Sequence, residues 1–237
     1  MNVDVVLLPR DLKSEHLRDR ACVVFDVLRA TTTMAAALAA GVEEIRLFDN
    51  LDAARTAAAA AYDKPRLLCG EAQCVAPAGF DLGNSPGQFL AAHRGATVFM
   101  CTTNGTRALL AARAAALLFT GAIVNAAAVA AAVRATDRDV TLLCAGTNGE
   151  VAMEDVIGAG AVIAALRAEQ VDDIGRLSLN VFEAGRNHLA GVLSETVGGI
   201  NVRQAGLSGD IDFAARLDAV PVVGVAAGDP LVVTRHR

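Results

Sequence analysis

Short hydrophobic runs alternate with Ala-rich helical patterns along the first two-thirds of the chain. We interpret the runs as strands at about 3–8, 21–26, 44–48, 66–69, 97–101, 116–119 and 139–144. Helical patterns separate them at about 32–40, 51–62, 105–113, 126–135 and 153–168. Strands that are apolar on both faces are typical of a parallel sheet covered on both sides. The pattern therefore predicts an α/β fold with α/β/α layers, in which a mostly parallel sheet has helices on both faces.

Residues that start or stop helices support this interpretation. Gly41 stands where a glycine commonly ends a helix, and Thr31, Thr32 and Thr33 stand where a hydroxyl could cap its first turn. Asn125 is expected to cap the helix that follows it.

After about residue 170 the chain is richer in Gly and in polar breaks. We expect one or two helices there, and then a return strand near 220–225 that completes or flanks the sheet. No Pro- or Ser-rich linker divides the chain, so we interpret residues 1–237 as one domain, with a subdivision near 170 as the alternative.

Composition and charge exclude several classes of protein. Hydrophobic residues make up 54% and aromatic residues only 4%, which predicts a core of Val, Leu, Ile and Ala. A net charge of -5 argues against nucleic acid or an acidic membrane surface as a partner. Residues 114–133 carry no charge, but Ala dominates them and Thr120 and Gly121 interrupt them, so we expect a strand and a helix rather than a membrane span. No basic leader precedes an apolar stretch, so we expect a cytoplasmic protein.

The cysteines and histidines do not form a metal-binding pattern. Four of the five cysteines, Cys22, Cys69, Cys101 and Cys144, lie in apolar runs and are expected to be reduced and structural. No CxxC spacing occurs and the four histidines are scattered, so a zinc site is not expected.

Polar residues follow four of the predicted strands, and in an open α/β sheet ligands bind beyond the carboxyl ends of the strands. In chain order these residues are Asp26, Arg29, Thr31, Thr32, Thr33, Glu71, Thr102, Thr103, Asn104, Gly105, Thr106, Glu154 and Asp155. The loop at 70–89 adds Asp81, Asn84 and Ser85. Each of these residues alone could be an ordinary helix cap or turn residue. Their occurrence at several strand ends predicts a shared site.

The chemistry of this set suggests a hard divalent cation and an oxyanion. The carboxylates that could bind Mg²⁺ are Asp26, Glu71, Asp81, Glu154 and Asp155. The hydroxyl, amide and glycine residues of the set are expected to hold the anion, with Arg29 as its cation. No GxxxxGK[ST] motif occurs, and Leu28 stands where an Asp-x-Asp nucleophile motif would need an acid, so we favour neither a P-loop nor a covalent aspartate.

Four motifs together resemble the 2-phosphosulfolactate phosphatase family. They are FDVLRATTTM (25–34), GFDLGNSP (79–86), CTTNGTRAL (101–109) and CAGTNGEVAMEDVIGAGAVI (144–163). The resemblance implies an Mg²⁺-dependent phosphatase that hydrolyses 2-phospho-3-sulfolactate to 3-sulfolactate and phosphate, a step of coenzyme M synthesis. It assigns the family's acids to the five carboxylates named above. The family usually has Arg after Gly70-Glu71, where this chain has Ala72.

These residues and the resemblance together predict metal-assisted hydrolysis of a small anionic phosphorylated substrate. Its catalytic candidates are Asp26, Arg29, Glu71 and Asn104. With Ala72 in place of arginine, cations for the second acidic group of the substrate are expected from Arg107, Arg186 or Arg203. A homodimer is expected. The alternatives are a phosphatase of another phosphorylated hydroxy acid and a non-catalytic protein that binds a phosphorylated metabolite.

Overall fold

The computed structural model describes residues 1–61 and 65–237. Within these residues one sheet is formed, in the order β4-β5-β3-β10-β9-β6-β2-β7-β1-β8. The strands are β1 (Asn2–Val6), β2 (Ala21–Phe25), β3 (Glu44–Leu47), β4 (Arg66–Gly70), β5 (Thr97–Cys101), β6 (Leu117–Gly121), β7 (Val140–Cys144), β8 (Gln170–Val171), β9 (Gly224–Ala227) and β10 (Val232–Arg235).

Nine α-helices occur within the described residues. They are α1 (Ala30–Ala39), α2 (Leu51–Ala60), α3 (Gly105–Ala111), α4 (Ala126–Arg134), α5 (Met153–Leu166), α6 (Asp173–Gly185), α7 (Leu189–Glu195), α8 (Val197–Gln204) and α9 (Ser208–Ala214). Short 3-10 helices occupy Pro9–Asp11, Ser14–His16, Pro86–Gln88, Ala91–His93 and Ile123–Asn125. The helix predicted at 51–62 ends at Ala60, and its predicted last residue lies outside the described part of the chain.

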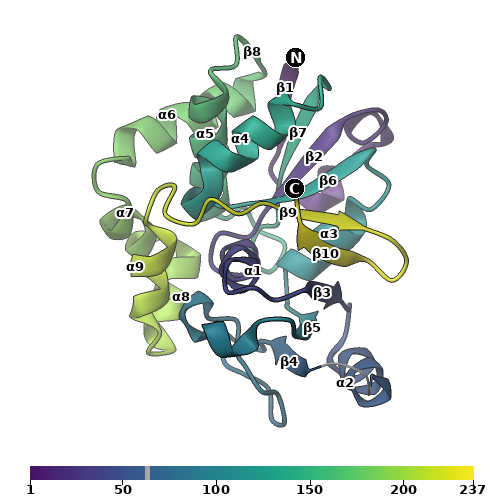
Figure 1. Ribbon diagram of the computed structural model, residues 1–237. Helices are drawn as coiled ribbons and strands as arrows, with labels where there is room; N and C mark the ends of the chain where they lie inside the picture. Colours follow the sequence, from purple (N-terminus) through teal and green to yellow (C-terminus); the bar gives the residue numbers. More distant parts are fainter. Residues whose placement is uncertain (62–64) are drawn as a thin grey trace.

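Helices cover both faces of the sheet, as the alternating directions of the side chains along β2 show. Val23 and Phe25 point into one hydrophobic cluster, which includes residues of α4, α5 and α6. Cys22 and Val24 point into the other, which includes residues of α1 and α3. Successive side chains of a strand point to opposite faces, so two cores lie on the two sides of the sheet. The predicted α/β fold, with helices on both faces of a mostly parallel sheet, is confirmed (Figure 1).

The last two strands lie inside the sheet and not at its edge. β9 and β10 form an antiparallel hairpin that pairs with β6 on one side and β3 on the other, whereas the other pairings of the described strands are parallel. The return strand predicted near 220–225 corresponds to β9, which begins at Gly224. A second strand, β10, follows it, and the pair completes the sheet from inside and not from its edge. Gly224 makes the insertion possible, because a Cβ there would lie 2.6 Å from the Thr120 hydroxyl and 2.7 Å from Val233.

The helix ends differ in part from expectation. Gly41 ends α1 with a φ of +93°, as predicted. The three threonines lie inside the first turn of α1 and do not cap it, because the helix begins at Ala30. Asn125 precedes α4, but its side chain accepts a bond from the Ala122 N–H (2.8 Å) and donates one to the Val222 carbonyl (2.8 Å). Its predicted capping role is therefore wrong.

The segment after residue 170 holds more helix than expected. α6, α7, α8 and α9 follow one another there, instead of one or two helices. They cover one side of the molecule beside α5 (Figure 1).

The uncharged stretch at 114–133 folds as β6, a 3-10 turn and most of α4, in agreement with the prediction. In the described part of the chain, no helix has both the length and the apolar character needed to cross a bilayer. All five cysteines are free thiols, and Cys74 alone is not fully buried.

Candidate active site

The segments that follow β4 and β5 meet those that follow β2 and β7 around the start of α1. Four strands separate β5 from β2, which would hold their ends roughly 24 Å apart in a flat sheet. Yet Gly105, at the start of α3, packs on Asp26, which follows β2, and a Cβ on Gly105 would lie 2.7 Å from Asp26 Oδ2. The sheet therefore curls around α1, which lies near the centre of the molecule (Figure 1). Only glycine allows this close approach.

A cavity of about 740 Å³ opens at these strand ends. Its walls come from the segments that follow β2, β4, β5 and β7, and from α8. The polar and charged side chains that line it are those of Asp26, Arg29, Glu71, Gln73, Asn84, Thr103, Asn104, Thr147, Asn148, Asn201 and Gln204. The structure thus brings together residues that the sequence placed after separate strands.

Asp26 is the buried carboxylate of this cavity. Its Oδ1 accepts the Ala30 N–H (3.0 Å), which fixes the carboxylate at the start of α1. Burial raises the pKa of Asp26 to about 6, the bond from Ala30 opposes this shift, and the charges of Glu71 and Glu154 add to it. In such a place the ionised form of a carboxylate is unfavourable. It is stabilised by a bound cation, and without one the carboxylate tends to take up a proton.

Glu154 and Asp155 lie behind the cavity at the start of α5. Both are buried, and burial raises the pKa of each. Asp155 accepts the Val27 N–H (2.8 Å) and the Gly146 N–H (3.0 Å), so it ties the turn after β2 to the turn after β7. Glu154 Oε2 has no hydrogen-bond partner among the described residues. Asp155 is therefore placed as a structural tie, whereas Glu154 keeps an acceptor for a ligand.

Glu71 fixes the loop walls of the cavity. Its Oε1 accepts the Thr103 N–H (2.7 Å) and its Oε2 accepts the Cys74 N–H (3.0 Å). Asn104 also lines the cavity, and its Oδ1 accepts the Asn148 N–H (3.2 Å). The two Thr-Asn-Gly turns of the sequence are thus joined to each other here.

Arg29 is held from behind by two elements distant in sequence. Its Nη1 donates to Asp210 Oδ2 (2.6 Å) and to the Ser85 hydroxyl (3.1 Å), and its Nη2 donates to the Cys74 carbonyl. The side chain is 2% exposed and still lines the cavity. The sequence analysis did not include Asp210, which lies on α9, because no residue near it in the chain indicates a contact with Arg29.

Asn84 and its neighbours complete the wall. Asn84 lines the cavity at 3% exposure, and its Oδ1 has no partner among the described residues. Its carbonyl accepts the Thr33 hydroxyl (3.0 Å), which joins the loop at 70–89 to α1. A buried acceptor without a partner is costly, and a ligand donor or a water would relieve that cost.

Most of the threonines expected to bind substrate are engaged elsewhere. Thr31 and Thr32 donate their hydroxyls to the carbonyls of Asp26 (2.9 Å) and Val27 (2.8 Å). The Thr102 hydroxyl accepts the Thr106 N–H (3.1 Å), and the Thr106 hydroxyl donates to the Thr102 carbonyl (2.7 Å). These hydroxyls shape the turns and are not among the groups that line the cavity. Thr103 is the exception.

Asp81 is exposed and does not line the cavity. Its Oδ2 accepts the Leu68 N–H (2.8 Å), which secures the loop at 70–89 to β4. We therefore leave Asp81 out of the candidate metal ligands.

The three arginines expected to meet a second acidic group also lie elsewhere. Arg186 pairs with Glu183 (3.0 Å), and Arg203 donates to the Ser194 carbonyl (3.2 Å). Arg107 lines a different surface hollow, beside Asp49. Among the described residues, Arg29 is the one cation that lines the cavity.

The carboxylates fit a hydrated magnesium ion better than a closed metal site. Mg²⁺ commonly takes one or two protein carboxylates and keeps several waters. Asp26 and Glu71 line the cavity, and Glu154 presents its unpartnered oxygen nearby. No three His, Cys, Asp or Glu side chains of the described residues are arranged as a preformed metal site.

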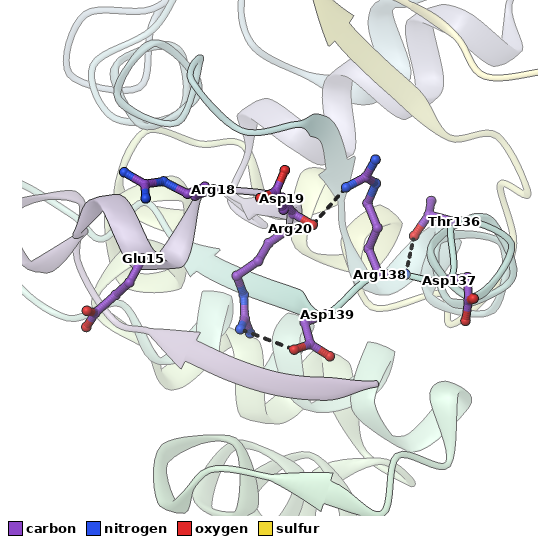
Figure 2. A pocket seen from close by; sticks show the side chains of 8 residues that line it. All are labelled: Glu15, Arg18, Asp19, Arg20, Thr136, Asp137, Arg138 and Asp139. Carbon is purple, nitrogen blue, oxygen red and sulfur yellow. Dashed lines mark hydrogen bonds and ion pairs between the residues drawn. The ribbon is translucent and has the colours of Figure 1, made fainter.

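A second hollow, of about 660 Å³, lies at the opposite ends of the strands, before β2 and β7. Figure 2 shows its lining, which consists of Glu15, Arg18, Asp19, Arg20, Thr136, Asp137, Arg138 and Asp139. Acids and bases alternate along it, and Arg20 pairs with both Asp4 (2.7 Å) and Asp139 (3.8 Å). Because ligands of open α/β sheets bind at carboxyl ends, we assign the site to the cavity around Asp26.

Comparison with known proteins decides the family. A family model described as 2-phosphosulpholactate phosphatase matches residues 6–229. The chain belongs to the 2-phosphosulfolactate phosphatase family. The resemblance inferred from the four motifs is thereby confirmed.

Relatives in this family match nearly the whole chain. A probable 2-phosphosulfolactate phosphatase of Carboxydothermus hydrogenoformans is 36% identical over 224 residues, which cover 94% of this chain and 92% of the relative. A protein of the same description from Deinococcus radiodurans is 39% identical over 223 residues, covering 92% and 90%. Another, from Synechococcus, is 38% identical over 211 residues, covering 86% and 87%.

The sequence analysis missed the contribution of the last third of the chain to this cavity. Asn201 and Gln204 on α8 line the cavity three residues apart, on one helix face. Gly198 lies against Glu154, so a side chain there would collide with that carboxylate. Gly198 and Asp210 lie in the segments Gly198-Gly199 and Gly209–Phe213, which are outside the four motifs that carried the resemblance.

Proposed function

We propose that the protein is a phosphoric monoester hydrolase that converts 2-phospho-3-sulfolactate to 3-sulfolactate and phosphate. One observation carries the proposal: in a chain of this family, a buried carboxylate, Asp26, and a buried guanidinium, Arg29, line the same cavity at the carboxyl ends of the strands. A site with this pair can place a carboxylate near the attacking water and a fixed positive charge near the phosphoryl oxygens, which are the groups that phosphoryl transfer needs.

Magnesium is part of the proposal. Asp26 and Glu71 would hold it, with Glu154 as a further acceptor. A bound Mg²⁺ supplies Lewis acidity toward the phosphoryl group and offsets the negative charge of the cavity. The raised pKa of Asp26 supports a cation here, because burial beside Glu71 and Glu154 leaves its anion short of positive charge.

The chain's own residues have separable roles in this reaction. Arg29 has an Nε–H and a second Nη2–H that no described residue accepts, and these would bind phosphoryl oxygens and stabilise the charge that develops on them. A carboxylate of the Asp26–Glu71 pair would accept the proton of the attacking water. Asn104 and Asn84 would orient the reactants by hydrogen bonds from the cavity wall.

Neutral amides would meet the second acidic group of the substrate. Arg29 is the one cation lining the described cavity, so the sulfonate would be held by the amide groups of Asn201 and Gln204. These side chains have no hydrogen-bond partner among the described residues and stand on one face of α8. Neutral donors give a weaker hold than an arginine, so other phosphorylated hydroxy acids remain a second candidate substrate class.

The test is phosphate release from 2-phospho-3-sulfolactate, 2-phospholactate and glycerol 2-phosphate, with Mg²⁺ and with EDTA. We expect turnover of the sulfonated ester at the highest kcat/KM, and loss of that turnover in EDTA. Full activity in metal-free buffer would remove magnesium from the proposal. Saturable binding with no phosphate release would favour the non-catalytic alternative. A role in coenzyme M synthesis, a cytoplasmic location and a homodimer stay predictions.

A further inference from the structure

Arg29 is fixed by acceptors that come from two parts of the chain distant from it in sequence. Asp210 lies on α9, Ser85 and Cys74 lie in the loop at 70–89, and Arg29 itself precedes α1. The Ser85 hydroxyl also donates to Asp210 Oδ2 (2.7 Å), so the carboxylate, the hydroxyl and the guanidinium form a closed triangle. Such a triangle leaves the guanidinium plane a single orientation.

The triangle is buried on the side away from the cavity. The side chains of Arg29 and Asp210 are 2% and 10% exposed, and Asp210 is not among the residues that line the cavity. A buried guanidinium needs a compensating charge, which Asp210 supplies. An arginine that must offer particular N–H groups to a phosphoryl group also loses less entropy on binding if its plane is already fixed.

We propose that Asp210 is the positioning residue of the site, which orients Arg29 toward the phosphoryl group without touching the substrate. The inference rests on the proposed phosphatase function and extends it to a residue of α9. The competing explanation is a purely structural tie, in which the pair fastens α9 to the turn after β2 and affects activity only through stability.

A double-mutant cycle on kcat/KM separates the two explanations. If Asp210 acts through Arg29, Asp210→Ala lowers kcat/KM about tenfold or more in the Arg29 protein, the range seen when a group that orients an active-site ligand is removed. In an Arg29→Ala background the same substitution changes kcat/KM by less than about twofold. Equal losses in both backgrounds would overturn the proposal.

Two further variants control the cycle. Asp210→Asn keeps an acceptor for Arg29 and Ser85, so it recovers most of the lost kcat/KM, and it serves where the alanine variant does not fold. Asp212 is exposed on the same helix, and Asp212→Ala should leave kcat/KM unchanged. A loss with Asp210→Asn as large as with Arg29→Ala would mean that charge, and not orientation, is what Asp210 contributes, which overturns the positioning role.

A readout independent of turnover keeps the inference separate from the proposed function. Restricted rotation of a fixed guanidinium gives separate Nη–H signals in ¹H–¹⁵N NMR spectra, and Arg29→Lys identifies those of Arg29. We expect these signals to be resolved in the wild type and to merge in Asp210→Ala. Merged signals in the wild type overturn the anchoring. Resolved signals in a wild type that hydrolyses none of the phosphoesters would uphold the anchoring and remove the phosphatase proposal alone.

Discussion

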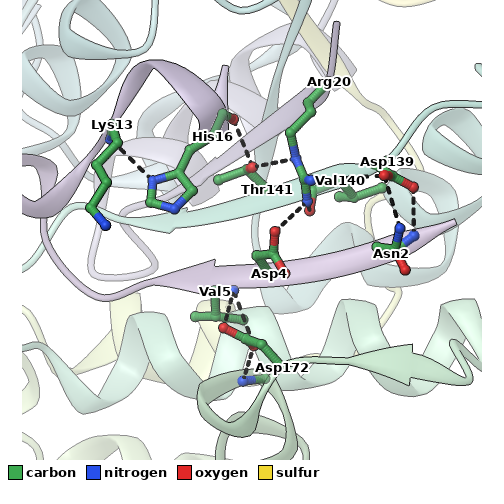
Figure 3. Close-up of polar contacts among 11 residues, drawn as sticks. Asn2, Asp4, Val5, Lys13, His16, Arg20, Asp139, Val140, Thr141 and Asp172 are labelled. Atoms are coloured by element: carbon green, nitrogen blue, oxygen red, sulfur yellow. Dashed lines mark hydrogen bonds and ion pairs between the residues drawn. The ribbon is translucent and has the colours of Figure 1, made fainter. Parts of the chain in front are cut away.

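The two ends of the sheet handle charge in opposite ways. At the amino end, Arg20 pairs with Asp4 and Asp139 and also donates to the Val140 carbonyl (2.7 Å), as Figure 3 shows. At the carboxyl end, Asp26 and Glu154 are buried together with no arginine or lysine paired to either among the described residues. Paired charges hold strands together, whereas crowded like charges make a region that is costly until a cation arrives.

The pKa shifts of the two regions have opposite directions. Backbone and side-chain bonds from Asn2 lower the pKa of Asp139, and Arg20 contributes to the same effect. Burial raises the pKa of Asp26 to about 6. A carboxylate whose pKa is lowered stabilises the fold as an anion, and one whose pKa is raised destabilises it as an anion. At the carboxyl end the ionised Asp26 therefore lowers the stability of the fold, as is common for charged groups at functional sites.

The largest expected effect follows from removing the Asp26 charge. Asp26→Asn should lower kcat by about two orders of magnitude or more, because it removes a group that holds the metal or moves the proton. The same change should raise the melting temperature in metal-free buffer at pH 7.5. Steady-state kinetics and thermal unfolding measure the two effects. A rate within about threefold of wild type would reduce Asp26 to an acceptor for the first turn of α1.

The next effect is a pH dependence of stability in the metal-free protein. Between the unfolded pKa of 3.8 and the folded pKa of about 6, the folded state holds more protons at Asp26. The free energy of unfolding should therefore fall as pH rises through this window, by on the order of 3 kcal/mol at most. Urea unfolding at pH 4 and pH 7 tests this, with Asp26→Asn as the control whose slope is reduced. A free energy of unfolding that rises over the same pH window would contradict a raised pKa at Asp26.

A smaller effect is expected when a cation is added to the cavity. Ala72 lines it, at the position where the resemblance to the family leads us to expect arginine. Ala72→Arg should lower KM for 2-phospho-3-sulfolactate about tenfold, as one charge-assisted hydrogen bond would, and should scarcely change KM for glycerol 2-phosphate. Arg203→Ala is the matched control and should alter neither value, since Arg203 does not line the cavity. Equal effects on both substrates would mean that residue 72 does not face the sulfonate.

The smallest effect is expected at the amino end. Arg20→Met should lower the free energy of unfolding by about 1 kcal/mol, because its ion pairs are partly exposed. It should leave kcat/KM unchanged. Arg18→Met, at an exposed position of the same hollow, should change neither quantity. A loss of activity in Arg20→Met would show that the two ends of the sheet are coupled.

The sequence predicted those features that depend on local pattern. Hydrophobic runs gave the parallel strands, and the rule for strand ends placed Asp26, Glu71 and Asn104 in one cavity. What it could not predict depends on contacts between distant residues. Asp210 reaches Arg29 across 181 positions, and the hairpin of β9 and β10 enters the middle of the sheet. Asp81 has the right chemistry for a metal ligand, but the Leu68 N–H holds it outside the cavity.

The position of that hairpin has a consequence for how the protein is made. β4, β5 and β3 connect by strand pairing to β6, β2, β7, β1 and β8 only through β9 and β10, within the described residues. Residues 224–235 emerge from the ribosome after all the strands that they join. The strand pairing that joins the two parallel portions can therefore form only after these last residues are made, and the cavity around Asp26, which takes walls from both portions, is completed as the sheet closes. Pairings between segments so far apart in sequence also make folding slow, so the nascent chain exposes unpaired strand edges for longer than a protein built from local contacts.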